Sequence, residues 1–235
     1  MNDFRYEHFD VQAVVNLVKK YYKQNNHISI RMKRAINTAL KTIISTANVN
    51  MIWRKLPIIQ LKDCCAIYST GYPVKSRKLL HVLSYCDEVI LFAATLGRPL
   101  DSVMKQDKLR MHEKLVLDQV ASKVMEAVME IGQKQIGEIC NPGEGMTARY
   151  SPGHCDWPIE QQDIIFSLLP MELLGIHLSP SYLMTPRKSV TALIGIGDKE
   201  EVNQHGNACL QCDDTTCEYR RNTKPKQFIE GGSNV

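Results

Sequence analysis

The segment from Arg149 to Pro158 reads RYSPGHCDWP and combines residue types that suit the binding of an anionic ligand. Pro152 and Pro158 each fix their own φ near about −65°, and Gly153 lacks the Cβ that would hold a ligand away from the backbone. Arg149 supplies a permanently charged, forked guanidinium that can bind a carboxylate through two hydrogen bonds. These residues predict a rigid loop that binds a carboxylate or a phosphate. The alternative is an ordinary Pro-Gly turn before a helix.

A helix is expected directly after this segment. Asp156 is placed near its cap, Pro158 in its first turn, and Gly175 at its end as a left-handed residue. The apolar residues between these points are Ile159, Ile164, Ile165, Leu168 and Leu169. Free N–H groups and partial positive charge at a helix start favour an anion. We therefore expect the amino end of this helix to face the ligand.

A row of polar side chains is predicted on one face of a long helix upstream. Asp118, Ser122 and Glu126 recur at i, i+4 and i+8, away from the apolar stripe of that helix. Most helical carboxylates form a solvated face, and Glu130 is assigned to such a face. The alternative for Glu126 is that its carboxylate neutralises a cationic group of a bound ligand.

Two further patterns near the carboxyl end bear on ligand binding. The basic connection Arg187-Lys188-Ser189 can serve a second anionic group. Gly195-Ile-Gly197 does not indicate a dinucleotide site, because the third glycine is absent and the motif ends a strand late in the chain.

A cysteine cluster suggests a metal site. His205, Cys209, Cys212 and Cys217 place three thiols and an imidazole in a polar segment with few apolar neighbours. The two residues between Cys209 and Cys212 are a spacing that suits zinc or an iron–sulfur cluster, with Cys209, Cys212 and Cys217 as ligands. His205 or a distant cysteine such as Cys155 is a candidate for the fourth ligand, and a group of free thiols is the alternative.

Hydrophobic periodicity predicts the elements that position these residues. The chain is expected to form an α+β fold with one main domain. Helices are predicted at about 10–24, 29–46, 75–85 and 100–138, and strands at about 64–69, 88–94, 176–178 and 189–196.

Composition sets limits on the class of protein. The chain has 235 residues, of which 44% are hydrophobic and 23% charged, enough for one sizeable core. The formal net charge is only +4, and the Lys and Arg residues are scattered along the chain instead of forming a stripe with interleaved aromatic residues. Nucleic acid is therefore not an expected partner. The amino terminus carries acidic residues, and no run reaches the roughly 20 apolar residues of a membrane span. A cytoplasmic protein with reduced cysteines and no membrane association is expected.

The segment at 149–158 resembles the RxxxGYxxxP element of the S-adenosylmethionine-binding activation domain of cobalamin-dependent methionine synthase. Stand-alone members of that family read close to RFSPGYGDWP. The stretches VILFAATLG from Val89, LDQVASKVMEAVME at 117–130 and SPSYLMTPRKSVTALIGIG at 179–197 are also similar to family segments. The resemblance covers about residues 75 to 197. His154 stands where the family usually has tyrosine.

The resemblance implies an α+β fold with a twisted, mostly antiparallel sheet and long helices. It divides the chain into a helical amino-terminal part of the same domain at 1–74 and a binding core at 75–204. The cysteine cluster at 205–221 and a flexible tail at 222–235 follow. The residues it assigns to S-adenosylmethionine are Glu126, Arg149, Tyr150, Gly153 and His154.

The resemblance implies reductive activation of a corrinoid methyltransferase, namely a methionine synthase, with S-adenosylmethionine as methyl donor to the cobalt. The cobalamin is held by the partner protein, a flavodoxin- or ferredoxin-like donor supplies electrons, and no side chain acts as acid, base or nucleophile. The alternatives are a non-catalytic module that docks on a corrinoid protein or holds a metal, and a metal-dependent regulator.

Overall fold

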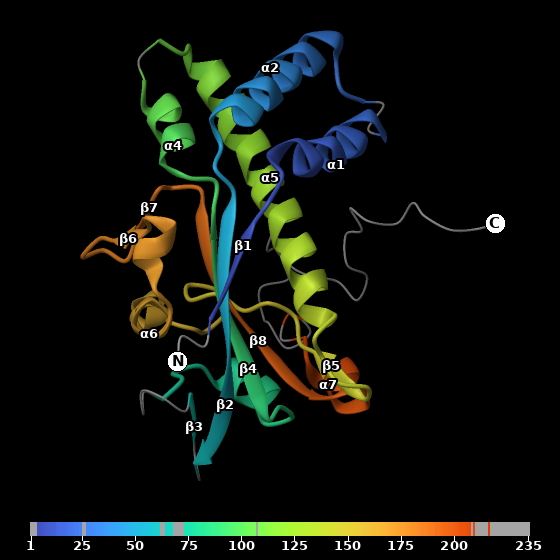
Figure 1. Cartoon of the computed structure of the whole chain (residues 1–235), viewed down its shortest axis with the longest axis vertical. Helices are drawn as coiled ribbons and strands as arrows, with labels where there is room; N and C mark the ends of the chain where they lie inside the picture. The colour runs from blue at the N-terminus through green and yellow to red at the C-terminus, as the bar shows by residue number, and fades with distance from the viewer. Residues whose placement is uncertain are drawn as a thin grey trace, which may run out of the picture.

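An antiparallel sheet of six strands forms the centre of the protein (Figure 1). The computed structural model describes residues 4–24, 27–61, 64–67, 73–106, 108–207, 209 and 216. The order along the sheet is β1 (Arg5–His8), β2 (Asn50–Leu61), β4 (Glu88–Thr95), β8 (Ser189–Asp198) and β5 (Glu144–Met146). Strand β3 (Cys64–Ile67) pairs with the far half of β2.

Helices cover both faces of this sheet. One face carries α1 (Val11–Gln24), α2 (Ile30–Thr46), α4 (Arg98–Lys105) and α5 (Met111–Gly137). The opposite face carries α3 (Arg77–Leu83), α6 (Gln162–Leu168) and the 3-10 turn η2 (Met171–Leu174). The remaining elements are η1 (Ile159–Gln161), the two-stranded sheet of β6 (His177–Leu178) and β7 (Met184–Thr185), and α7 (Lys199–His205).

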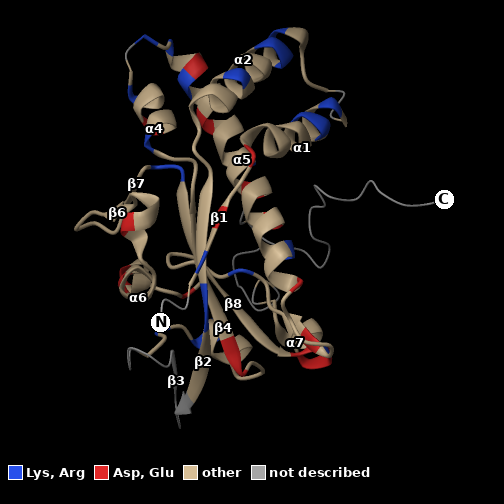
Figure 2. Cartoon of the chain, viewed as in Figure 1, with Lys and Arg blue, Asp and Glu red and all other residues tan. Residues whose placement is uncertain are grey.

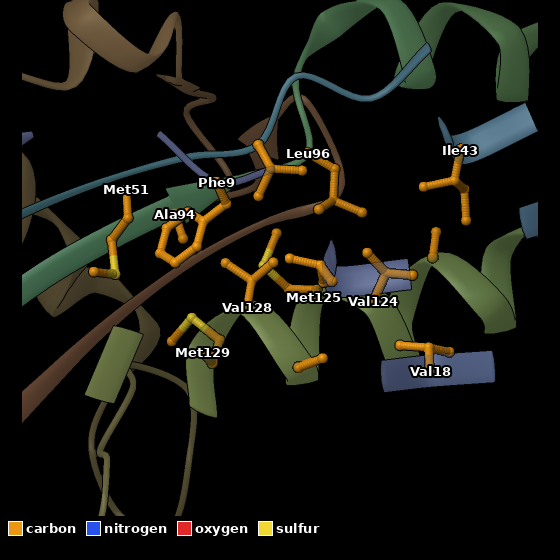
Figure 3. Close-up of a cluster of buried hydrophobic side chains, with 14 of the residues drawn as sticks. Phe9, Val18, Ile43, Met51, Ala94, Leu96, Val124, Met125, Val128 and Met129 are labelled. Carbon is orange, nitrogen blue, oxygen red and sulfur yellow. The ribbon is translucent and has the colours of Figure 1, made fainter. Parts of the chain in front are cut away.

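Strand β4 shows why the sheet must be covered on both sides. Its residues alternate between the two cores, with Phe92 and Ala94 toward α5 and Leu91 and Ala93 toward α6. Each of these side chains is at most 1% exposed. Figure 3 shows the larger core, in which Phe9, Met51 and Leu96 meet side chains of α1, α2 and α5. The α+β class and the antiparallel sheet expected from the sequence are confirmed.

Several predicted elements are confirmed, and two helices end earlier than expected. The helix predicted at 100–138 is wrong as a single element, because the chain leaves helical geometry at Gln106 and re-enters it at Met111. Glu113 fixes the restart by accepting the backbone N–H of Arg110 at 2.9 Å. The helix predicted from Pro158 to Gly175 is instead η1, α6 and η2 in succession.

Gly175 does have the predicted left-handed conformation, with φ of 62°, but it closes η2 and not a long helix. Pro170 precedes η2 and ends α6, since it has no N–H to continue the helical bonds. Within the part of the chain that the structure describes, no helix has both the length and the apolar character that a membrane span requires.

The glycine pair in β8 serves packing. A Cβ on Gly197 would lie 2.1 Å from the carbonyl oxygen of Tyr85 and 2.9 Å from the Cα of Cys86. Both are backbone atoms of the connection between α3 and β4, so neither can move aside easily. Gly197 therefore lets this connection lie directly on the sheet.

Gly197→Ala is expected to lower the free energy of unfolding by about 1–3 kcal/mol, the usual cost of overpacking. Urea denaturation followed by circular dichroism measures the change. Gly137→Ala is the matched control, because the new Cβ would meet only the flexible methyl end of Met146. Equal stability of the two variants would contradict this account.

Candidate functional site

The chain that follows β5 continues along the edge of β8 and carries the predicted binding segment. Met146 pairs with Ile196, and the N–H of Thr147 donates to the carbonyl of Gly195 at 3.0 Å. The N–H of Gly195 in turn donates to the Thr147 hydroxyl at 2.9 Å. This segment therefore extends the sheet beyond β5.

One extra residue in this extension decides where Arg149 points. An unbroken register from Met146 and Ile196 would place Arg149 opposite Leu193. Tyr150 takes that position instead, and exchanges backbone hydrogen bonds of 2.9 and 2.7 Å with Leu193. One extra residue on one of two paired strands is a β-bulge, a feature that often redirects side chains next to binding sites. Tyr150 consequently enters the core beneath α6, and Arg149 lies against α5.

Arg149 is held on α5 by two hydrogen bonds. Its Nη1 donates to the carbonyl oxygen of Met129 at 3.1 Å and to Oε1 of Gln133 at 2.7 Å. Gln133 was not singled out from the sequence, although it lies seven residues after Glu126 and so on nearly the same helical face. These contacts orient the planar guanidinium at the half-buried edge of the sheet.

Glu126 lies one helical turn before Met129 on α5. Its side chain is 40% exposed and forms an ion pair of 2.9 Å with Lys123. Burial, the neighbouring Tyr21 and the charge of Glu126 raise the pKa of Tyr22 to about 12, so the carboxylate also faces α1. Glu126 and the α5 residues that bind Arg149, Met129 and Gln133, therefore lie close together on one helix. The rise along the helix axis from Glu126 to Met129 is about 4.5 Å.

The predicted polar row on α5 binds two different lysines: Asp118 and Ser122 contact Lys188, and Glu126 contacts Lys123. Lys188, from the basic connection before β8, forms an ion pair of 2.9 Å with Asp118 and donates to Ser122 Oγ at 2.8 Å. The carboxylate of Asp118 therefore offsets the charge of Lys188. The N–H of Arg187 donates to Asp101 at 3.1 Å, so this connection is tied to α4 as well.

The residues after Tyr150 form a tight, exposed turn. The N–H of Gly153 donates to the Trp157 carbonyl at 2.8 Å, and the N–H of Trp157 donates to the His154 carbonyl at 3.0 Å. Gly153 has φ of 88°, which a residue with a Cβ rarely adopts. Trp157 is 1% exposed and anchors the turn through a 2.8 Å bond from Nε1 to Gln161. Gly153, His154 and Cys155 are exposed on this anchored turn.

Asp156 does not cap the helix that follows it. Its carboxylate accepts hydrogen bonds from Ser76 Oγ at 2.5 Å, from the N–H of Arg77 at 2.9 Å and from the N–H of Lys78 at 3.3 Å. The prediction that Asp156 caps the following helix is therefore wrong. Asp156 instead caps the start of α3, which is distant in the sequence. Burial raises the pKa of Asp156, but these three hydrogen bonds outweigh it and the net pKa is lowered.

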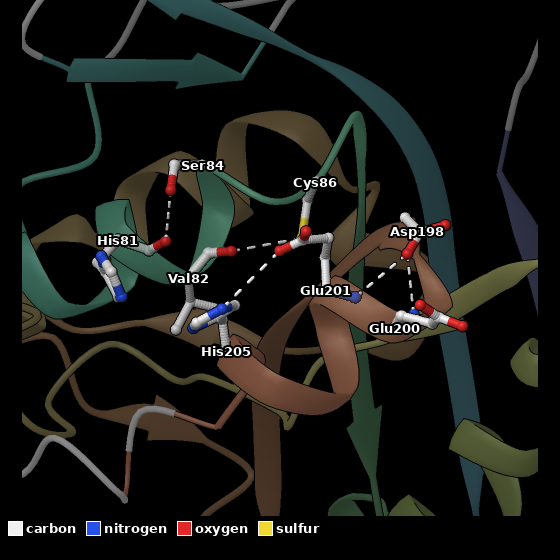
Figure 4. Close-up of polar contacts among 8 residues, drawn as sticks. All are labelled: His81, Val82, Ser84, Cys86, Asp198, Glu200, Glu201 and His205. Carbon is white, nitrogen blue, oxygen red and sulfur yellow. Dashed lines mark hydrogen bonds and ion pairs between the residues drawn. The ribbon is translucent and has the colours of Figure 1, made fainter.

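The predicted metal site lies largely outside the described residues. Cys212 and Cys217 are not described, and Cys209 is half-buried with its N–H donating to Asn207 Oδ1 at 3.0 Å. His205 stacks on Tyr85 with ring centroids 4.2 Å apart. The Nε2 of His205 lies 3.8 Å from the carboxylate of Glu201 (Figure 4). Among the residues that the structure describes, no three His, Cys, Asp or Glu side chains are grouped to hold a metal ion. Zinc or iron–sulfur binding by the cysteines stays a prediction.

Comparison with known proteins identifies the fold. No family model matches the chain, and no curated protein matches it. Among solved structures, the chain is similar to the crystal structure of the MetH reactivation domain bound to AdoHcy, with a TM-score of 0.65 and 16% sequence identity. The alignment covers 82% of this chain and 78% of the other. This chain has the fold of the MetH reactivation domain. The sequence resemblance to the methionine synthase activation domain is confirmed at the level of the fold.

The shared fold extends beyond the limits of the sequence resemblance. The similar segments run from about residue 75 to 197, whereas the structural match to the MetH reactivation domain takes in 82% of the chain. Residues 5–61 supply β1 and β2 to the same sheet as β4 and β8. The amino-terminal part and the binding segment therefore belong to one sheet.

Asp156→Asn is expected to lower the free energy of unfolding by about 1–2 kcal/mol at neutral pH, because the N-terminus of α3 loses its charged acceptor. A carboxyl whose pKa is lowered by folding stabilises the protein above its unfolded pKa of about 3.9, and this stabilisation is lost as pH falls through the folded value. Urea denaturation at neutral pH and near pH 3 should show the variant approaching the wild type in acid. Asp163→Asn, at an exposed position of α6, is the control. A difference that persists in acid would contradict this role.

Proposed function

We propose that this protein binds S-adenosylmethionine beside the bulge at 148–149 and serves in the reductive activation of a corrinoid methyltransferase. The observation that carries the proposal is the fold shared with a reactivation domain whose crystal structure contains AdoHcy, the demethylated form of that ligand. The orientation of Arg149 on α5 supports it independently of the comparison.

The charges of the ligand fit the residues of this site. S-adenosylmethionine carries a carboxylate, an ammonium and a sulfonium, so its site needs a fixed cation and a nearby anion. Arg149 supplies a cation whose plane is set by Met129 and Gln133. Glu126 supplies a partly exposed carboxylate on the same helix. Each charge-assisted hydrogen bond to the ligand contributes about 1.5–3 kcal/mol.

The turn after Tyr150 is suited to close contact with the ligand. Gly153 gives the turn its φ of 88°, although the position of its missing Cβ faces Ile159 and not open space. Gly153, His154 and Cys155 are exposed and so accessible to a ligand. Trp157 fixes the turn from below, since its side chain is buried and hydrogen-bonded to Gln161. A turn that is already rigid loses little entropy when a ligand binds. Tyr150 contributes backbone contacts to β8 that hold the segment in place.

The part of this chain in the reaction is to hold the methyl donor. An external reductant would supply one electron to the Co(II) corrinoid of the partner, and the sulfonium methyl group of S-adenosylmethionine would then pass to the reduced cobalt, leaving S-adenosylhomocysteine. Arg149 and Glu126 hold the two ends of the amino-acid part of the donor, which fixes the position of the sulfonium. Positioning alone can supply a large share of the rate for a transfer between two bound molecules.

Isothermal titration calorimetry with S-adenosylmethionine tests the site. Arg149→Ala is expected to raise Kd by about tenfold to 100-fold, the equivalent of one desolvated charge-assisted contact. His154→Ala is expected to raise it much less, because this exposed imidazole is not assigned to the carboxylate, ammonium or sulfonium of the ligand. Gln133→Ala is expected to have an intermediate effect, because it releases the guanidinium without removing it. Thermal unfolding of each variant shows whether the fold is kept. Equal effects of Arg149→Ala and His154→Ala would disprove the assignment.

Methyl transfer is tested with the complete system. The protein, a methionine synthase lacking its own activation domain, a reductant and S-adenosylmethionine are mixed with cobalt in the Co(II) state. Methylcobalamin is expected to appear in the absorption spectrum, and Arg149→Ala is expected to slow its appearance at subsaturating S-adenosylmethionine. Binding of S-adenosylmethionine without methylcobalamin would favour the non-catalytic docking module instead.

A further inference from the structure

The first two helices form a strongly basic surface. Residues 11–46 contain seven Lys and Arg and no Asp or Glu, so this short segment has a formal charge of +7 against +4 for the whole chain. In Figure 2 the blue Lys and Arg positions mark α1 and α2, whereas red acidic positions gather at the opposite end near α7. The expectation that basic residues are scattered is therefore wrong for this region. The side chains that form the α1–α2 basic surface are Lys19, Lys20, Lys23, Arg31, Lys33, Arg34 and Lys41.

These charges have no internal counter-charge in the part of the chain that is described. Six of the seven side chains are exposed, and Lys19 is half-buried. None of the seven forms an ion pair with a described carboxylate, whereas three acidic residues of α5 are paired elsewhere: Glu113 with Arg110, Asp118 with Lys188 and Glu126 with Lys123. A concentration of unpaired like charge costs stability and produces a strong local potential. Such a potential attracts an acidic partner.

Apolar side chains lie among these cations. Ile30 is 73% exposed and Met32 is 43% exposed, and they flank Arg31 in the first turn of α2. Exposed Met and Arg together are typical of protein–protein interfaces. The wide apolar faces of both helices are buried against α5, which leaves no continuous apolar stripe of the kind that binds a lipid surface. The surface therefore favours an acidic protein over an anionic membrane.

The α1–α2 basic surface borders the proposed ligand site. Tyr21, in α1, lies beneath the Lys123 ammonium, which is 5.7 Å from the centre of the ring. The same ammonium is 2.9 Å from Glu126. A protein bound to α1 and α2 would thus lie next to the part of α5 that is proposed to hold the methyl donor.

We propose that the α1–α2 basic surface docks a small acidic electron-transfer protein. This inference rests on the proposed function, which requires an external electron donor, and it assigns the place where that donor binds. The interaction is of the weak, electrostatically steered kind that is usual between redox partners, with fast association and strong salt dependence. Lys20, Lys33 and Arg34 supply the charge, and Ile30 and Met32 supply the apolar contact.

The test uses a flavodoxin and a plant-type ferredoxin, two acidic electron-transfer proteins, with binding measured by calorimetry and by fluorescence. At least one is expected to bind the full chain at about 0.05 M salt and to lose most of its affinity at about 0.3 M. K33E/R34E is expected to weaken this binding by about tenfold or more. K75E/K199E is the matched control: it makes the same change in net charge at exposed positions away from α1 and α2, and binding should stay close to wild type.

Each contrary result has a definite meaning. Equal weakening by K33E/R34E and K75E/K199E, or no binding of either redox protein at low salt, would overturn the docking site. Tighter binding of phosphatidylserine vesicles or duplex DNA than of both proteins, lost in K33E/R34E, would assign the surface to that ligand instead. S-adenosylmethionine calorimetry on K33E/R34E is expected to match wild type. Failure of S-adenosylmethionine to bind the wild-type protein would disprove the proposed function separately.

Discussion

A single extra residue at the edge of β8 sets the arrangement of the candidate site. The segment after β5 stays in register with β8 as far as Thr147 and rejoins it at Tyr150, one position later than a regular ladder would allow. Because neighbouring side chains of an extended chain point to opposite faces, this shift sends Tyr150 into the core beneath α6 and leaves Arg149 on the α5 side. The cation that could bind a ligand is thus fixed by the same backbone hydrogen bonds that finish the sheet.

Helix α5 is the second support of the site, and its half-buried face explains the pairing of charges there. The face that meets β8 offers the Met129 carbonyl and Gln133 to Arg149, and Asp118 and Ser122 to Lys188. Partly buried charges are costly without partners, so each cation that reaches α5 is matched by an acceptor. The exposed faces of α1 and α2 are under no such constraint. Their positive charge stays in water, available for long-range attraction.

Helices α1 and α2 were predictable, because each carries an apolar stripe at helical spacing. The limits of α1 and α2 lie within a residue or two of the predicted ones. Strand β2 was missed, since Arg54, Lys55 and Pro57 interrupt its apolar pattern. Pro57 is tolerated where β2 changes neighbour from β1 to β3, a place where a missing N–H costs little. Lys55 is accommodated by an ion pair of 2.5 Å with Glu88 on β4.

The sequence by itself determined the class of fold, the unusual turn at 149–158 and the residue types that suit a zwitterionic ligand, because these depend on local conformational preference and on side-chain chemistry. The tertiary structure decided which groups meet. Asp156 caps α3 and not the helix that follows it, Gln133 orients Arg149, and the cations of α1 and α2 come together on one surface. These contacts join residues far apart along the chain or depend on strand register. Neither is encoded in any short stretch of sequence, so packing alone fixes them.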